Sequence, residues 1–176
     1  MRSFRILPIP LKLLIQWSMK TKKAVTSLEV KEDYLSQHSK RNVLRFVGCI
    51  ENASEDTAEI VLNVINNELN VPCDKNEIDS AFRIGSYISG DNTSKPRTIL
   101  VQFVTNIKRN EVFLAKKHLK NSNISVFEDL TKQRFNLLQA AKRKYGKNKA
   151  WSSGGKIYVW DAPNNKKSCV FSITEL

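Results

Sequence analysis

The side chains that most suggest chemistry are four arginines, Arg41, Arg45, Arg83 and Arg97, with Lys95 two residues before the last. A guanidinium stays charged, donates hydrogen bonds from a planar fork and stacks on flat rings, so it suits both phosphates and bases. We therefore treat these five residues as candidate nucleic-acid contacts. Each arginine could instead be solvated or form a salt bridge with carboxylates in the middle of the chain.

A second group of cations lies near the C-terminus. It contains Lys142, Arg143, Lys144 and Lys147, and Arg134 lies upstream. Most charge runs are solvated faces of helices. Here the local excess of positive charge favours binding to a nucleic-acid backbone.

The charge is uneven along the chain. The 176 residues carry a net charge of +12, and the sequence pI is about 9.7. Residues 1–42 contribute +6, residues 43–105 contribute −4 and residues 106–176 contribute +10. A basic protein attracts polyanions. This distribution predicts a cationic surface built from the two ends.

Catalysis finds no support in the sequence, and we predict neither an enzyme nor a cofactor or metal site. It contains no phosphate-binding glycine motif, catalytic triad pattern or cluster of metal ligands. The carboxylate pairs Glu55/Asp56 and Glu128/Asp129 lie at predicted helix starts. The cysteines, Cys49, Cys73 and Cys169, are odd in number and far apart. They favour a reducing compartment, cytoplasmic or nuclear.

Residues 43–127 alternate between strand and helix patterns. Strands are predicted at 43–48, 78–84, 97–104 and 124–127, with a helix capped by Ser54 and another over 106–119. The order β-α-β-β-α-β describes a four-stranded sheet with two helices on one face and the other face open.

Alternation along the strands assigns faces to this sheet. Leu44 and Phe46 point inward, so Arg45 points outward, and residues 99, 101 and 103 point inward as well. An RNA-recognition motif stacks bases on aromatic rings of its central strands. Those rings are missing here, so Arg45 takes the usual aromatic place. The side to which Phe82 points is left open.

Both ends of the chain differ from the middle. Residues 11–40 read as a helix, and five of its eight heptad seam positions are apolar: Leu11, Leu14, Val25, Leu28 and Leu35. The helix either lies on its own domain or is the remnant of a coiled coil. Residues 1–20 are either an irregular extension or a targeting segment.

The C-terminal residues read as a small α/β unit. A helix over 130–145 is expected to bury Phe135, Leu138, Ala141 and Tyr145, and to stop at Gly146. A hairpin turn at 152–155 and a strand over 170–173 follow. Trp151, Tyr158 and Trp160 could stack on bases, but such aromatic residues more often belong to a core, and we assign Trp151 to the core.

Five motifs, covering about Leu28 to Leu176, resemble a known family. They are the segment LEVKEDYLSQHSKRNVLRFVG, Phe82-Arg83-Ile84-Gly85, Lys95-Pro96-Arg97 before TILVQF, Glu128-Asp129-Leu130-Thr131 with Arg134, and Trp151 with Gly155-Lys156-Ile157-Tyr158-Val159. In this order they resemble the first open-reading-frame proteins of LINE-type retrotransposons and the baculovirus few-polyhedra (FP) proteins. The sequence departs from the family at Phe82, where histidine is usual, and at Lys40 and Lys95, where arginine is usual.

The resemblance implies an RNA-recognition-like (RRM-like) domain with a C-terminal domain, single-stranded RNA or DNA as the partner, and nucleic-acid chaperone behaviour. It also implies oligomerisation through an N-terminal coiled coil, which the interrupted seam limits to a weak homo-oligomer. The expected fold is α+β, with an N-terminal extension and helix in residues 1–42, an RRM-like sandwich in 43–127 and a small C-terminal α/β unit that binds nucleic acid in 128–176. A protein-interaction adaptor that uses the N-terminal helix and a basic surface is the alternative. A membrane partner is not expected.

Overall fold

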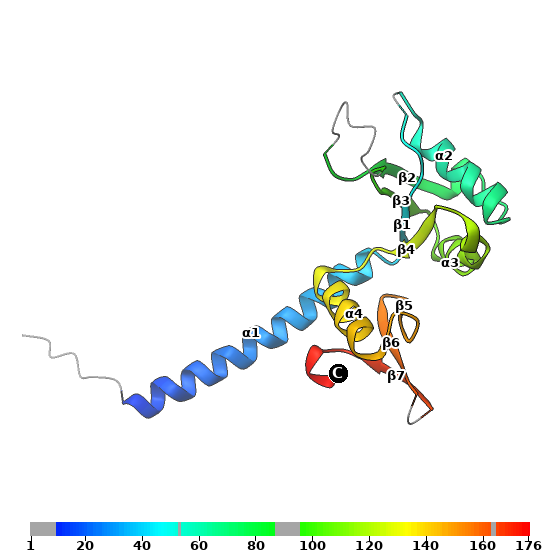
Figure 1. Ribbon diagram of the computed structural model, residues 1–176. Coiled ribbons are helices and arrows are strands. Elements are labelled where there is room, and N and C mark those ends of the chain that lie inside the picture. The colour runs from blue at the N-terminus through cyan, green and yellow to red at the C-terminus, as the bar shows by residue number, and fades with distance from the viewer. Residues whose placement is uncertain (1–9, 53, 87–95, 163–164) are drawn as a thin grey trace, which may run out of the picture. The chain divides into compact units, whose positions relative to one another are not determined.

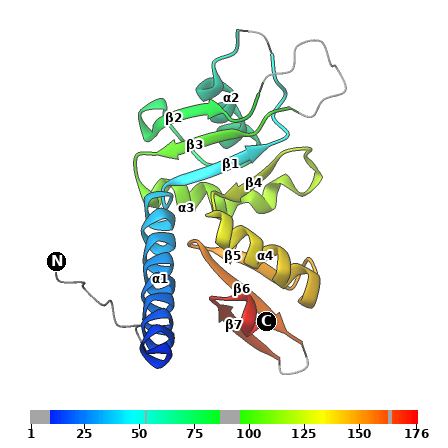
Figure 2. The ribbon, with the colours of Figure 1, turned by 90° about the vertical axis from the view of Figure 1, so that its left-hand side faces the viewer.

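The computed structural model describes residues 10–52, 54–86, 96–162 and 165–176, so the predicted loop at 87–95 lies outside the described residues. The chain divides into two compact units, Met1–Ser36 and Gln37–Leu176. It combines α-helices with antiparallel sheets of four and three strands, which confirms the predicted α+β class (Figures 1 and 2).

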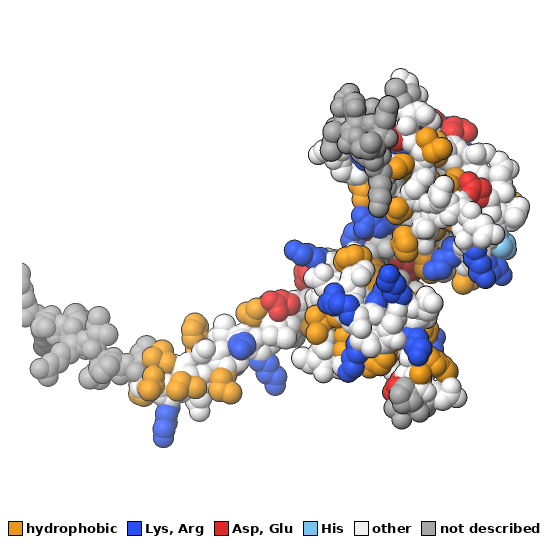
Figure 3. All heavy atoms as spheres, viewed as in Figure 1, with side chains coloured by type: hydrophobic (Ala, Val, Ile, Leu, Met, Phe, Trp, Pro, Cys, Tyr) orange, Lys and Arg blue, Asp and Glu red, His pale blue; other side chains and the backbone are white. Residues whose placement is uncertain are grey.

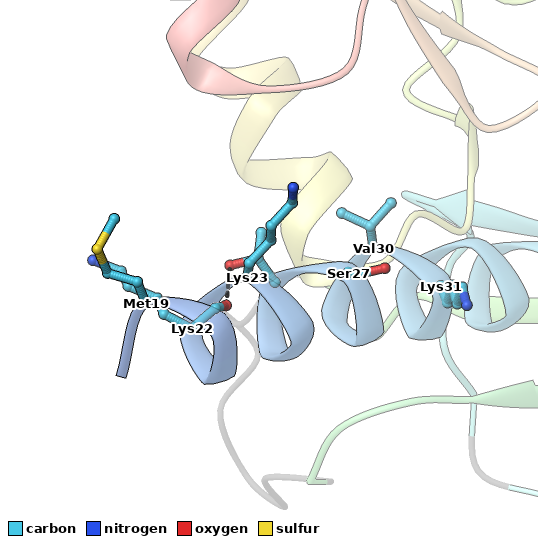
Figure 4. A pocket seen from close by; sticks show the side chains of 7 residues that line it. Met19, Lys22, Lys23, Ser27, Val30 and Lys31 are labelled. Atoms are coloured by element: carbon cyan, nitrogen blue, oxygen red, sulfur yellow. Dashed lines mark hydrogen bonds between the residues drawn. The ribbon is translucent and has the colours of Figure 1, made fainter. Parts of the chain in front are cut away.

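The first unit contains most of α1, which runs from Leu11 to Ser39. The helix begins directly after Pro10, so residues 11–20 are helical. The prediction of an irregular extension over residues 1–20 is therefore wrong for 11–20, and residues 1–9 lie outside the described part. All five apolar seam residues are exposed. A shallow hollow on the same helix is lined by Met19, Lys22, Lys23, Thr26, Ser27, Val30 and Lys31 (Figure 4).

The four-stranded sheet has the strand order β2-β3-β1-β4, and every neighbouring pair is antiparallel. Figure 1 shows α2 and α3 on the same side of this sheet. The elements are β1 (Val43–Val47), α2 (Thr57–Asn63), β2 (Ile78–Arg83), β3 (Ile99–Phe103), α3 (Asn106–Ala115) and β4 (Ser125–Glu128).

The core lies between the sheet and the two helices. Leu44, Phe46, Ile99, Val101 and Phe103 are at most 1% exposed, as strand alternation predicts. Outward side chains on the opposite face are only partly covered. Because one face holds the apolar residues, a register slip of one residue would expose the whole set.

Gly48 ends β1 in a conformation that only glycine fits easily. Its φ is +93°, and a Cβ there would lie 2.2 Å from the backbone oxygen of Asn123. The chain can therefore leave the sheet beside the segment before β4 only with glycine at this position.

Several helix ends differ from the sequence predictions. Asp56, not Ser54, caps α2, and its carboxylate accepts hydrogen bonds from the backbone N–H groups of Ala58 and Glu59. Helix α2 continues as a π-helix over Val64–Glu68. Helix α3 is capped by Thr105 and continues as a 3₁₀ helix over Lys116–Asn121. Asp56 serves better than Ser54 because its carboxylate also matches the positive end of the helix.

The C-terminal sheet has the order β5-β6-β7 and is antiparallel throughout. Its strands are β5 (Ala150–Ser153), β6 (Lys156–Asp161) and β7 (Lys166–Val170), and α4 (Lys132–Tyr145) covers one face. The predicted turn and the stop at Gly146, with φ +101°, are confirmed.

Three predictions for this unit were wrong. Phe135 is 48% exposed, whereas Leu137 is buried beside Leu138 and Ala141, so the buried stripe of α4 does not include Phe135. The last strand ends at Val170, and a 3₁₀ turn follows over Ile173–Glu175. Trp151 is half-buried and lies outside the core, since it shares a sheet face with Tyr158 and not with Ala150.

The buried carboxylate of Glu128 links the two sheets. Arg109 of α3 donates to Glu128 Oε1 at 2.9 Å, and the backbone N–H of Gly155 donates to the same oxygen at 3.2 Å. Gly155 also lies against Gln37, so that a Cβ there would come within 2.7 Å of that side chain. The turn between β5 and β6 is thus fixed directly beside the end of β4.

Candidate nucleic-acid interface

A row of four side chains crosses the open face of the four-stranded sheet. The strand registers align Phe82 with Leu100, Leu100 with Arg45, and Arg45 with Phe127. Phe82 is 48% exposed and Phe127 is 50% exposed, one on each edge strand. The open face therefore offers a flat guanidinium near its centre and an aromatic ring at each edge, which are groups that stack on bases.

Arg45 lies outward, as predicted, and it has an intramolecular partner. Its Nε is 3.7 Å from Asp129 Oδ1, too far for a good hydrogen bond, and this nitrogen has no hydrogen-bond partner among the described residues. Lys40 Nζ forms a close ion pair with the other oxygen of Asp129. The side chain of Arg45 is 36% exposed, so it remains accessible from the open face.

Arg83 is held by the protein itself. Its guanidinium donates to both carboxylate oxygens of Glu55, from Nε at 2.5 Å and from Nη2 at 3.0 Å. The same guanidinium also donates to the carbonyls of Cys49, Ile50 and Arg97. With its side chain only 3% exposed, Arg83 fastens the segment after β1 to β2 and is not presented to a ligand.

Arg97 is held in a similar way. Its Nε and Nη2 donate to Glu51 Oε1 at 2.8 and 2.5 Å, and its backbone N–H donates to Glu51 Oε2. The side chain is 29% exposed. For Arg83 and Arg97 the structure therefore shows the salt bridges that the sequence left open as an alternative.

Glu55 and Glu51, the carboxylates that form ion pairs with Arg83 and Arg97, are stabilised as anions. Hydrogen bonding from Arg97 lowers the pKa of Glu51, and hydrogen bonding from Arg83 lowers the pKa of Glu55. In both cases desolvation acts in the opposite direction and is the weaker effect. The ion pairs therefore persist at neutral pH and weaken only in acid.

The other arginine candidates differ in how far they reach the surface. Arg41 is exposed and its Nη1 contacts the ring of His38 at 2.6 Å, while its carbonyl accepts from Asn106. Arg134 donates from Nη1 to the carbonyl of Gly155 at 2.8 Å, and so helps to hold the β5–β6 turn. Lys95 lies outside the described residues.

The four C-terminal cations lie at and just beyond the end of α4. Arg143, Lys144 and Lys147 are exposed, and Lys142 is half-buried. Lys and Arg side chains gather over α3 and α4 in Figure 3. Cations in the last turn also match the negative end of the helix dipole. They therefore suit the end of the helix and add positive charge to this surface.

Sequence reasoning missed Phe127 and left Phe82 undecided. Residues 124–127 were read as a strand without a register, although Val126 and Glu128 are both buried and so place Phe127 on the open face. The pairing of β4 with β1, which sets Phe127 beside Arg45, is not encoded in the local sequence of this strand. Glu128 and Asp129 do not cap α4, because Thr131 does; both carboxylates instead form ion pairs.

Neither models of known protein families nor curated proteins include a match to this chain. Within the described residues, none of the helices combines the length and apolar character that crossing a membrane requires.

Proposed function

We propose that this chain binds single-stranded nucleic acid, RNA in the first place, on the open face of its four-stranded sheet. The observation that carries the proposal is the row formed by Phe82, Leu100, Arg45 and Phe127. The exposed cations at the end of α4 add attraction to phosphate. Base stacking with backbone charge is the usual basis of single-strand binding without sequence preference.

We further propose an RRM-like classification for residues 43–127 and a relationship to the LINE first open-reading-frame and FP proteins. Two observations support it: the element order along the chain and the strand order β2-β3-β1-β4. A retroelement-derived nucleic-acid chaperone is the corresponding biological role. Strand-annealing assays on complementary oligonucleotides test it, since a chaperone accelerates annealing at protein concentrations that coat the strands.

The central experiment is a fluorescence anisotropy titration with a labelled oligouridylate of about 16 nucleotides. We expect Phe127→Leu to weaken binding by about 1–3 kcal/mol through loss of a stacking surface. The matched control is Phe135→Leu, because Phe135 is equally exposed but lies on α4. Equal affinities of the parent and Phe127→Leu, at equal helicity by circular dichroism, would remove the open face from the proposal.

A second candidate function is a protein-interaction adaptor acting through α1. The favouring observation is the exposure of the apolar seam, which ranges from 45% at Leu14 to 72% at Leu11. Three seam positions are polar or charged, namely Ser18, Thr21 and Glu32, so we expect at most a weak, concentration-dependent oligomer. Sedimentation equilibrium checks this expectation, and a stable trimer at low protein concentration would contradict it.

A further inference from the structure

The face of the three-stranded sheet that points away from α4 is built mainly from aromatic rings and lysines. Ala150, Ile157, Val159 and Val170 point toward α4 and are buried. Strand alternation and register therefore place another set of side chains together on the opposite face, which we call the outer face. Its rings are those of Trp151, Tyr158 and Trp160, and Lys156, Lys167 and Cys169 lie on the same face.

The rings of the outer face are already arranged for stacking. Trp151 and Tyr158 are cross-strand partners, and their ring centroids are 6.1 Å apart with an interplanar angle of 21°. Lys167 Nζ lies 4.3 Å from the centroid of Tyr158 and 5.6 Å from that of Trp151. Trp151, Tyr158 and Trp160 are all half-buried, so part of each side chain remains accessible to a ligand.

The lysine indicates what kind of ligand fits. An ammonium group over a ring occupies the place that the face of another flat group would take. Lys167 is exposed on a flexible stem, so it can move aside and meet a negative charge next to a stacked ring. Lys156, exposed on β6, adds positive charge to the same sheet.

The surroundings favour an anion with flat rings. Residues 106–176 carry a net charge of +10. A basic surface interleaved with aromatic side chains recognises the bases and the phosphates of a single strand together. The outer face shares no residue with the row on the four-stranded sheet.

We propose that the outer face is a second base-stacking site for single-stranded nucleic acid. Only the choice of ligand class rests on the function proposed above. With two stacking surfaces on separate sheets, one chain can hold two segments of a strand.

Tryptophan fluorescence tests the second site directly. The chain has three tryptophans, and Trp17→Phe leaves only Trp151 and Trp160, which both belong to the outer face. In that variant we expect an unlabelled oligouridylate to quench the tryptophan emission as bases stack on the indoles. The four-stranded sheet contains no tryptophan, so binding there alone leaves the emission unchanged.

Affinity provides the second measurement. We expect Trp151→Leu to weaken binding of labelled oligouridylate about tenfold, the loss typical of one stacking contact. The matched control is Trp17→Leu, which removes an exposed tryptophan from α1 and is expected to bind like the parent. Circular dichroism checks folding, and if Trp151→Leu does not fold, the quenching result decides.

The outcomes separate the two proposals. Quenching together with weaker binding of Trp151→Leu supports the second site. Normal anisotropy binding with unchanged emission and unchanged affinity of Trp151→Leu overturns it and leaves the proposed function in place. Absence of oligouridylate binding at low salt overturns both.

Discussion

The four-stranded sheet and the C-terminal unit use their cations in different ways. At the ends of β2 and β3, Arg83 and Arg97 form ion pairs with Glu55 and Glu51. Residues 43–105, which include all four, carry a net charge of −4. In the C-terminal unit, cations such as Lys144 remain exposed because acids are scarce there. Whether a basic side chain is exposed to a ligand thus depends more on nearby carboxylates than on whether it is a lysine or an arginine.

The largest effect expected from this difference is on stability. Replacing Arg83 by Ala leaves Glu55 without its main partner and three backbone carbonyls without donors, at a cost of about 3–5 kcal/mol. The same change at exposed Arg143 is expected to alter the free energy of unfolding by less than about 0.5 kcal/mol. Urea unfolding of the two variants compares them. Equal losses of unfolding free energy in the two variants would show that Arg83 contributes no more to stability than a solvated arginine.

A smaller effect is expected on binding at Arg45, whose side chain is 36% exposed on the open face of the sheet. Arg45→Lys keeps the charge but loses the plane and the fork of the guanidinium. We expect it to weaken single-stranded RNA binding nearly as much as Arg45→Ala, by about 1–3 kcal/mol. Anisotropy titrations measure all three proteins. If the lysine variant binds like the parent while the alanine variant does not, Arg45 acts as a simple charge.

Acid should weaken the ion pairs that hold Arg83 and Arg97. The pKa values of Glu51 and Glu55 are lower in the folded state than the ordinary value of 4.5. Their contribution to stability is therefore complete above about pH 4.5 and is lost as the pH falls through the lowered values. We expect Glu55→Gln to be less stable than the parent at neutral pH. We also expect its stability to fall less steeply than that of the parent as the pH is lowered. Parallel profiles of unfolding free energy against pH for the two proteins, measured with urea, would argue against a stabilising ion pair between Arg83 and Glu55.

The smallest effect is expected at the end of α4. Lys142→Ala removes a charge but no stacking group, so we expect a smaller loss of affinity than at Arg45. Its signature is the salt dependence, since loss of one phosphate contact flattens the slope of log affinity against log salt by about 0.7. Titrations between about 50 and 200 mM salt measure the slope. An unchanged slope would mark Lys142 as part of a solvated helix face.

The strands of the four-stranded sheet could be predicted from the sequence, because the alternation of apolar residues within a strand involves only neighbouring positions. Leu44, Phe46 and Phe103 occupy the core positions that alternation assigns to them. The partners of charged groups were not predictable in the same way. Glu51 meets Arg97 across 46 residues of sequence, and no local pattern encodes that contact.

The errors in the C-terminal unit have a related cause. Helix α4 has several apolar residues around its circumference, so spacing alone did not distinguish buried Leu137 from exposed Phe135. Similarly, the position of Trp151 depends on the β5–β6 register, which fixes the face that it shares with Tyr158. The register follows from the turn, and a strand cannot be assigned a face without it.

The cysteines provide a practical route to labelling the protein. Burial is the main cause that raises the pKa of both Cys49 and Cys73 to about 11. At pH 7 roughly one in ten thousand of these thiols is a thiolate, the form that reacts with alkylating dyes. Cys169 is only half-buried and lies opposite Tyr158 on β7. A maleimide dye added to the native protein should therefore attach first at Cys169, which would mark the outer face without any substitution.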